Sequence, residues 1–357
     1  MTAPSQTDAA RTSATQSSVS SAAGPIDPRQ LARDLKPFHR PRAWRSTVEL
    51  AITLVPFVAL YAAMLFALDA GYWLALVLAP VAGLLLLRLF IIQHDCGHGA
   101  FFARRSSNDW TGRALGVLTL TPYDCWRRSH ALHHAATGNL DARGFGDVDT
   151  LTVREFFEGS RWQRAFYRAY RHPLVLMGLG PAYLFLLRHR LPVGLMTAGS
   201  IYWVSAMATN AVIAAILFGL IWTFGFATVA LVFFPVLLTA ASMGVWLFYI
   251  QHQFEQAHWD REEDWSFHHA ALAGSSYLHL PAVLRWFTGN IGIHHVHHLA
   301  SRIPFYRLPE VLRAFPALSE VNRFTTRQTF KPLLLALWDE DERRLVTFRE
   351  AKARALR

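Results

Sequence analysis

The chain has few charged residues, and Asp, Glu, Lys and Arg are all absent between residues 191 and 254. Only 17% of the chain is charged, whereas 52% is hydrophobic, which is untypical of a soluble protein. A single helix over the uncharged segment would be about 95 Å long, roughly three times the hydrocarbon thickness of a bilayer. The segment must therefore fold back on itself, and the sequence predicts an integral membrane protein.

Cysteine is also scarce, with Cys96 and Cys125 as the only two. Two cysteines exclude a disulfide framework of the secreted type and a cysteine-ligated iron-sulfur cluster. The sequence also lacks a glycine-rich dinucleotide fingerprint and a C-x-x-C-H haem-attachment motif. A redox reaction in this protein would therefore draw its electrons from an external donor.

Hydropathy predicts four membrane spans, at about residues 51–68, 72–93, 198–222 and 227–250. Short turns at residues 69–71 and 223–225 would join them into two hairpins. The two turns carry no cations, whereas six cations cluster just before the first span. These six are Arg29, Arg33, Lys36, Arg40, Arg42 and Arg45. The positive-inside rule then places both termini and the remaining loops in the cytoplasm. Residues 1–25 are expected to be a disordered tail, and residues 26–357 a single membrane domain.

The formal net charge is +10 at neutral pH. The basic residues adjoin the predicted spans and form no recognised nucleic-acid-binding module, so nucleic acid is not an expected partner. On a cytoplasmic face this charge would attract anionic headgroups or an acidic electron-transfer protein. Residues 333–357 mix apolar and basic side chains, and we expect them to form an amphipathic helix.

Three of the histidine groups in this chain have the spacing of metal ligands. They are His94 and His98; His130, His133 and His134; and His294, His297 and His298. On a helix, residues three or four apart lie about 5–6 Å from each other on one face, so two imidazoles can bind one ion. We therefore expect each box to form half of a site. The boxes together supply too many nitrogens for one ion, and two metals are implied.

Ligand type leaves the metal open, because neutral imidazole suits zinc, iron, copper and nickel. The zinc-hydrolase pattern H-E-x-x-H is absent from the sequence. A non-catalytic metal transporter is an alternative of another class, but it would place ionisable ligands near the bilayer midplane, whereas these boxes lie beyond the span ends. Asp95, Asp147 and Asp149 are candidate acceptors for the free ring N–H of ligand histidines.

The boxes resemble those of the membrane fatty acid desaturase family. Residues 94–99, 130–134 and 289–298 are similar to its first, second and third boxes. Residues 146–153 and 302–306 resemble segments of bacterial acyl-lipid desaturases, and the similarity extends from about residue 34 onward. The resemblance implies an all-α integral membrane fold, with four transmembrane helices in two hairpins and a cytoplasmic helical cap that holds a di-iron site.

The resemblance also implies the ligands and the reaction. It adds His252, at the end of the fourth span, to the eight box histidines. It implies an O2-dependent oxidoreductase of a bacterial inner membrane that takes electrons from a donor such as ferredoxin. This enzyme would introduce a cis double bond into a membrane-lipid acyl chain. An alkane or lipid hydroxylase and a carotenoid ketolase use the same chemistry and stay open as alternatives.

Overall fold

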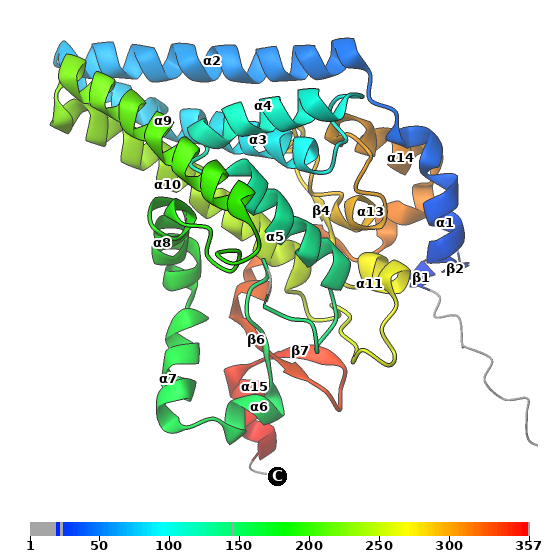
Figure 1. The fold of residues 1–357 in the computed structure, drawn as a ribbon. Helices are drawn as coiled ribbons and strands as arrows, with labels where there is room; N and C mark the ends of the chain where they lie inside the picture. Colours follow the sequence, from blue (N-terminus) through cyan, green and yellow to red (C-terminus); the bar gives the residue numbers. More distant parts are fainter. Residues whose placement is uncertain (1–18, 22–23, 145, 356–357) are drawn as a thin grey trace, which may run out of the picture.

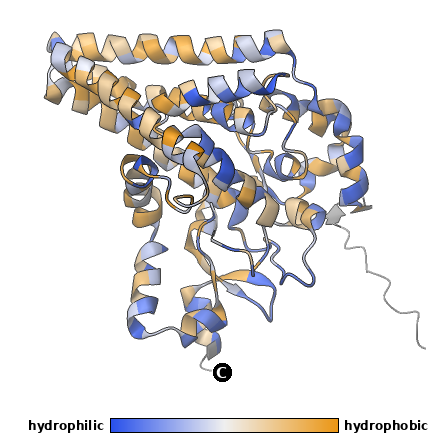
Figure 2. Ribbon diagram, in the orientation of Figure 1, coloured by the Kyte–Doolittle hydropathy of each residue, from blue (hydrophilic) through white to orange (hydrophobic). Residues whose placement is uncertain are grey.

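Four long apolar helices dominate the structure, a computed structural model that describes residues 19–21, 24–144 and 146–355 (Figure 1). They are α2 (Ala43–Asp69), α3 (Ala79–Gly97) with the 3-10 turn Trp73–Leu78 before it, α9 (Ser200–Phe224) and α10 (Phe226–His252). Each is long and apolar enough to cross a membrane. The four predicted spans are thus confirmed as apolar helices, and Figure 2 shows their apolar character along α2, α9 and α10.

The helix boundaries follow local backbone chemistry. α9 ends and α10 begins at Gly225, whose φ of +77° is a conformation that only glycine adopts without strain. The break falls within the turn predicted at residues 223–225. α2 begins earlier than residue 51, because Arg45 and Glu49 form an ion pair one turn apart and extend the helix beyond its apolar part.

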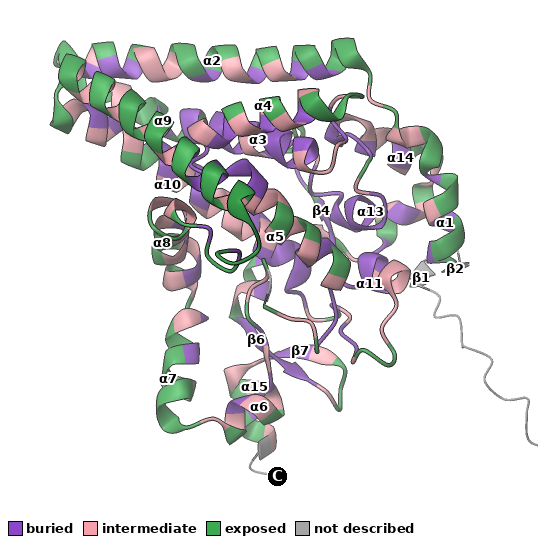
Figure 3. Cartoon of the chain, viewed as in Figure 1, coloured by how far each residue is buried: buried purple, intermediate pink, exposed green. Residues whose placement is uncertain are grey.

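α3 lies at the centre of the helical layer, in contact with α2, α4 and α10. In its apolar stretch 56% of the residues are buried inside the protein, compared with 17% in α9, which presents most of its surface outward (Figure 3). A buried ion pair joins the Arg88 guanidinium of α3 to Glu49 of α2. Arg88 also donates to the carbonyl of Trp286, so the same side chain ties α12 (Ala282–Phe287) to the spans.

Shorter helices complete the fold. They are α1 (Pro28–Asp34), α4 (Arg105–Leu118), α5 (Tyr123–Ala136), α6 (Val153–Glu158), α7 (Arg161–Tyr170), α8 (Gly180–Leu186), α11 (Phe267–Ala273), α13 (His294–Leu299), α14 (Leu308–Ala314) and α15 (Phe348–Ala355). A turn of π-helix, Val175–Leu179, precedes α8. In Figure 1, α5, α11 and α13 lie beside one another at the end of α3 and α10. Residues far apart in sequence therefore meet there.

The fold is not entirely helical, which corrects the all-α expectation. A three-stranded sheet is formed by β3 (Leu151–Thr152), β6 (Leu335–Asp339) and β7 (Arg344–Thr347), with β6 in the middle. β3 pairs with β6 in parallel, and β7 pairs with β6 antiparallel. A parallel pair joins β4 (Tyr277–His279) to β5 (Arg323–Thr325), and β1 (Val19–Ser21) pairs antiparallel with β2 (Gly24–Ile26). Most of the expected disordered tail, residues 1–18 and 22–23, lies outside the described residues.

The amphipathic helix expected over residues 333–357 was also wrong, because among the described residues of this segment only α15 is α-helical. The chain reverses after β6, where the Asp339 carboxylate accepts hydrogen bonds from the N–H groups of Asp341 and Glu342. Such side-chain bonding to the backbone favours a turn over a helix. The strands then bury Leu337 and Val346 against the side chains of α6 and α7.

Candidate metal centre

Nine histidines from four helices converge at one end of the helical layer. His94 and His98 come from the end of α3, and His252 is the last residue of α10. α5 carries His130, His133 and His134, and α13 carries His294, His297 and His298. Seven of the nine are buried, and His98 and His130 are half-buried. The predicted ligands therefore come together despite their separation in sequence.

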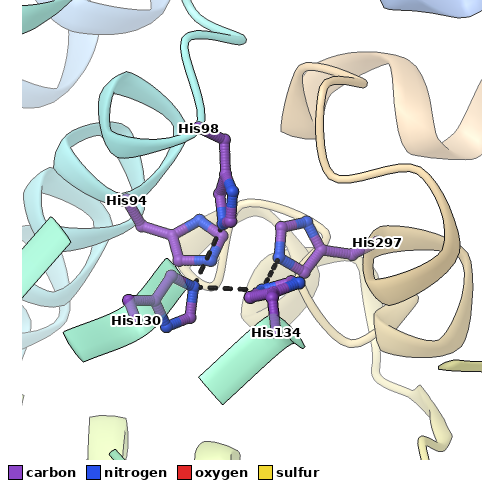
Figure 4. A group of neighbouring side chains, drawn as sticks. All are labelled: His94, His98, His130, His134 and His297. Carbon is purple, nitrogen blue, oxygen red and sulfur yellow. Dashed lines mark hydrogen bonds between the residues drawn. The ribbon is translucent and has the colours of Figure 1, made fainter. Parts of the chain in front are cut away.

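Five imidazoles form a first group: His94, His98, His130, His134 and His297. One ring nitrogen of each lies within 4.8 Å of the corresponding atoms of the others. The Nε2 atom of His130 is 3.0 Å from that of His98 and 3.1 Å from that of His134. The Nε2 atom of His134 is in turn 3.2 Å from that of His297, as the dashed lines in Figure 4 show.

A second group lies next to the first. Ring nitrogens of His133, His252 and His298 are within 4.8 Å of one another. The Nε2 atom of His294 lies 2.9 Å from the Nε2 atom of His252, which brings a fourth imidazole to this group. The rings of His134 and His298 stack at 4.0 Å, so the two groups are in direct contact.

The groups divide the boxes differently from our expectation that each box forms half of one site. In the second box, His130 and His134 enter the first group, whereas His133 enters the second. The helix explains this division, because residues i and i+4 share a face while the residue between them points elsewhere. α13 is divided likewise, with His297 in the first group and His298 in the second. Both α5 and α13 therefore contribute imidazoles to both groups.

The nitrogens fit metal ions. Among the described residues, Nε2 of His133 and both ring nitrogens of His298 are buried without a hydrogen-bond partner. Leaving a buried polar atom unpaired costs about 1–3 kcal/mol. Facing imidazole nitrogens are, in contrast, the usual environment of a transition-metal ion. The donor set is thus suited to two such ions, one in each group.

Burial keeps these imidazoles in the form that binds metals. Desolvation lowers the pKa of His98, His130 and His134 well below the ordinary histidine value, and the neighbouring imidazoles lower it further. The same causes lower the pKa of His297 and His298. Only a neutral imidazole has a free lone pair for a metal, so the site is prepared for binding near neutral pH.

Two of the three candidate carboxylates contact ligand histidines. Asp147 accepts from Nδ1 of His133, and Oδ1 of Asp95 lies 3.3 Å from Nδ1 of His94. Asp95 also accepts the backbone N–H of Phe305 at 2.7 Å, which ties the first box to the segment after the third. Such contacts fix the orientation and tautomer of a ligand imidazole. Asp149 differs, because its hydrogen bonds are made by the backbone: its N–H donates to the Tyr170 hydroxyl, and its carbonyl accepts from Arg171 and from the Tyr167 hydroxyl.

Close packing between α3 and α5 sets the distance between the first two boxes. The Trp126 ring stacks on His130 with centroids 4.5 Å apart. A Cβ atom on Gly97 would lie 2.8 Å from the Trp126 ring, closer than side chains normally approach. Sequence analysis did not identify Trp126 or Gly97, although both are within four residues of a box histidine.

The remaining histidines lie apart from the two groups. His295, within the third box, is buried with its Nε2 atom 3.0 Å from the carbonyl oxygen of Leu318. His258 and His269 approach Asp260 in a third cluster. The Asp260 carboxylate already pairs with Arg343 and with His258, so its oxygens have partners.

Comparison with known proteins agrees with this arrangement. A family model described as fatty acid desaturase matches residues 71–329, which include all nine histidines. A fatty acid desaturase of Bacillus subtilis is 40% identical over 324 residues, covering 91% of this chain and 92% of that protein. An sn-1 acyl-lipid omega-3 desaturase (ferredoxin) of Synechocystis is 28% identical over 271 residues, or 72% of each chain. A Nostoc protein of the same description is 26% identical over 274 residues, covering 70% of this chain and 69% of that protein.

The family model spans three of the four apolar helices, the three histidine boxes and the segments between them. The resemblance proposed from the boxes is confirmed, and with it an oxidoreductase that desaturates fatty acyl chains. The chain belongs to the fatty acid desaturase family.

Proposed function

We propose that this membrane enzyme introduces a cis double bond into the acyl chain of a membrane lipid, using O2 and two external electrons. Two iron ions would be held by the nine histidines, five in the first group and four in the second. The observation that carries the proposal is the convergence of nine imidazoles, seven of them buried, at the ends of two apolar helices. Two relatives are described as acyl-lipid desaturases, which supports a lipid-borne acyl chain.

The chemistry requires a redox metal, because no side-chain acid, base or nucleophile breaks an unactivated C–H bond. Bound iron would supply that redox chemistry with O2. The reaction balances when the saturated chain, one O2, two electrons and two protons yield the unsaturated chain and two waters. The protein contributes a cluster of facing imidazoles, with Asp147 orienting His133 and Asp95 orienting His94.

An apolar cavity of about 270 Å³ among the spans supports the substrate assignment. Its walls include Phe57, Ala62, Leu86, Leu118, Leu217 and Val236, from α2, α3, α4, α9 and α10. Leu86 precedes His94 by two helical turns on α3, which is about 12 Å. We propose that the cavity receives part of the acyl chain whose reacting carbons lie at the metal centre.

A pair of neighbouring alanines tests this cavity. Ala62→Phe would fill part of the cavity, and we expect the preference of the enzyme to move toward shorter acyl chains. Ala63→Phe adds the same bulk at the adjacent position, which is exposed on the outer side of α2, and should leave the preference unchanged. If the two variants show the same acyl-chain-length preference, the cavity does not bind the substrate.

The electron donor is proposed to be a ferredoxin-like protein. The Synechocystis and Nostoc relatives carry ferredoxin in their descriptions, and a net charge of +10 favours an acidic partner. We further propose that the apolar helices form two hairpins across a bacterial inner membrane, with a cap and the histidines on the cytoplasmic side. The arginines and lysine that precede α2 support this orientation.

Mass spectrometry of acyl chains tests the reaction. Lipids from a host that expresses the chain should contain a new species lighter by two hydrogens, with one double bond at a fixed position. The same host expressing His133→Ala should lack it, although the variant is inserted in the membrane. A product heavier by one oxygen and without unsaturation would instead identify a hydroxylase that uses the same metals.

A further inference from the structure

Arg171 is a buried cation without a carboxylate partner. It follows α7, is 3% exposed, and none of the described acidic side chains lies within ion-pair distance of its guanidinium. Its partners are neutral acceptors: the carbonyl oxygens of Asp149 and Leu335 at 2.9 Å, the Thr150 hydroxyl at 3.2 Å, the Tyr249 hydroxyl at 3.0 Å and Oε1 of Gln253 at 2.9 Å. Only its Nε atom lacks a partner among the described residues.

Such an arrangement is costly, because a buried charge without a counter-ion loses its hydration and gains no ion pair. The planar guanidinium does, however, hold several acceptors in fixed directions, which an ammonium group does not. Three segments are fixed by this one side chain: residues 149–150, the last turn of α10, and β6. These directed hydrogen bonds suit a side chain that fixes the relative positions of the three segments better than one that only fills space in the core.

One of these segments carries a proposed metal ligand. Tyr249 precedes His252 by three residues and Gln253 follows it, so Arg171 contacts α10 on both sides of that histidine. Nε2 of Gln253 also donates to the Thr150 hydroxyl at 3.1 Å, and the Tyr249 hydroxyl donates to the Leu335 carbonyl at 2.7 Å. The end of α10 is thereby fixed in position and rotation.

A second segment leads to another ligand. Arg171 holds the carbonyl of Asp149 and the hydroxyl of Thr150, just after Asp147. The Asp147 carboxylate contacts Nδ1 of His133. His133 and His252 both belong to the second group of imidazoles. By contrast, among the described residues no hydrogen bond joins Arg171 to a histidine of the first group or to a residue next to one.

We propose that Arg171 is a positioning residue for the second metal position, and that it sets the geometry of His133 and His252 together. The inference rests on the proposed di-iron function, because it assumes that both groups bind iron. Loss of the guanidinium would loosen two of the four imidazoles of the second group and leave the five of the first group in place. The two iron positions should therefore respond unequally.

The test is an iron titration of purified variants. In Arg171→Gln we expect one of two irons to bind about 10- to 100-fold more weakly, the usual effect of removing a group that orients ligands. The other iron should keep its wild-type affinity, and the spectroscopic signature of the iron pair should give way to that of a single iron. Arg171→Lys keeps the charge but reaches fewer acceptors, so it should retain more of the second iron than Arg171→Gln.

Arg190→Gln is the matched control. Arg190 is also an arginine that donates to neutral acceptors, the carbonyl of Leu120 and Oδ1 of Asn210, but neither partner is a proposed metal ligand or the sequence neighbour of one. This variant should keep both irons. If Arg171→Gln fails to accumulate, Tyr249→Phe and Gln253→Met each remove one acceptor and should weaken the second iron alone.

Three outcomes would overturn the inference: unchanged affinity for both irons in Arg171→Gln, equal weakening of both, or the same loss in Arg190→Gln. Failure of the wild-type protein to bind two irons would instead reject the di-iron function itself. Because wild type and variants are titrated side by side, the two failures are distinguished in one experiment.

Discussion

The histidines of α13 have different surroundings, although they are the same residue type and lie close together in sequence. His297 faces the first group and His298 the second, whereas the Nε2 atom of His295 lies 3.0 Å from the Leu318 carbonyl oxygen. Rotation by about 100° per residue around the helix separates these directions. The position on the helix, more than the residue type, therefore decides which imidazole is available to a metal.

Two substitutions on α13 separate these roles. His297→Ala should reduce bound iron and abolish turnover, because it removes a ligand of the first group. His295→Ala should retain both irons but lower the free energy of unfolding by about 1–3 kcal/mol, since the Leu318 carbonyl loses one donor and keeps only the longer hydrogen bond, 3.4 Å, from the Val321 N–H. Iron analysis and thermal denaturation measure the two effects. Loss of iron in His295→Ala would make this residue part of the site.

The lowered pKa values of the buried imidazoles predict how iron binding depends on pH. Burial lowers the pKa of His98, His130 and His297 well below about 6.5, the ordinary value. The folded protein should therefore retain iron at pH about 6, and release it as the pH falls further through the lowered pKa values. Below about pH 6.5 the unfolded chain binds more protons at these histidines than the folded protein does. The free energy of unfolding should therefore decrease as the pH falls from about 6.5 through the lowered pKa values.

Stepwise dialysis with iron analysis checks this dependence, and circular dichroism at each pH shows whether the helices persist. An iron-release midpoint at the ordinary imidazole pKa, with the helices intact, would mean that burial does not protect the ligands. Release only on loss of helical signal would mean that unfolding, and not ligand protonation, frees the metal.

At the scale of the elements, the distance between α3 and α5 is set by a glycine. Gly97→Ala would place a methyl group against the Trp126 ring, which stacks on His130. We expect lower iron affinity at the first group, measured by titration. Gly244→Ala is the control, since its methyl group would make an ordinary 3.5 Å contact with Leu87, between α10 and α3. Equal iron affinity in both variants would show that α5 tolerates displacement.

Much of this architecture could be predicted from local sequence. Apolar segments about as long as a bilayer is thick predicted the four long helices, and histidine spacing predicted eight of the nine residues that converge. The ninth, His252, followed from the family resemblance and not from spacing. The division of the second and third boxes between two groups could not be predicted without the rotation of α5 and α13 relative to α3 and α10. The strands β6 and β7 were missed because their charged turn and basic residues also fit an amphipathic helix.

Arg171 was missed for a different reason. In the sequence it is one arginine among several near α7, and no short motif distinguishes it. Its partners lie near residues 149, 249 and 335, and only tertiary contacts bring these segments to one guanidinium. Contacts between distant segments of this kind do not appear in local sequence patterns.

On the scale of the whole molecule, the histidine groups lie at one end of the apolar helices α3 and α10. α3 and α10 both end at the metal centre, and the break at Gly225 lies at the other end of α10. The proposed orientation predicts that alkaline phosphatase fused after Gly225 is active in a bacterial host, because this enzyme folds only outside the cytoplasm. A fluorescent protein fused to the C-terminus should fluoresce from the cytoplasm. The reverse pattern would reject the orientation.

The spread of ligands along the chain also determines when the protein can become active. The first group needs His297 and the second needs His298, both encoded after all four apolar helices. Neither group is complete until the ribosome has synthesised the third box, so membrane insertion begins before the metal centre can assemble. With iron as the proposed metal, a cell short of iron would therefore accumulate inserted, inactive chains, and later iron supply would activate them without new protein synthesis.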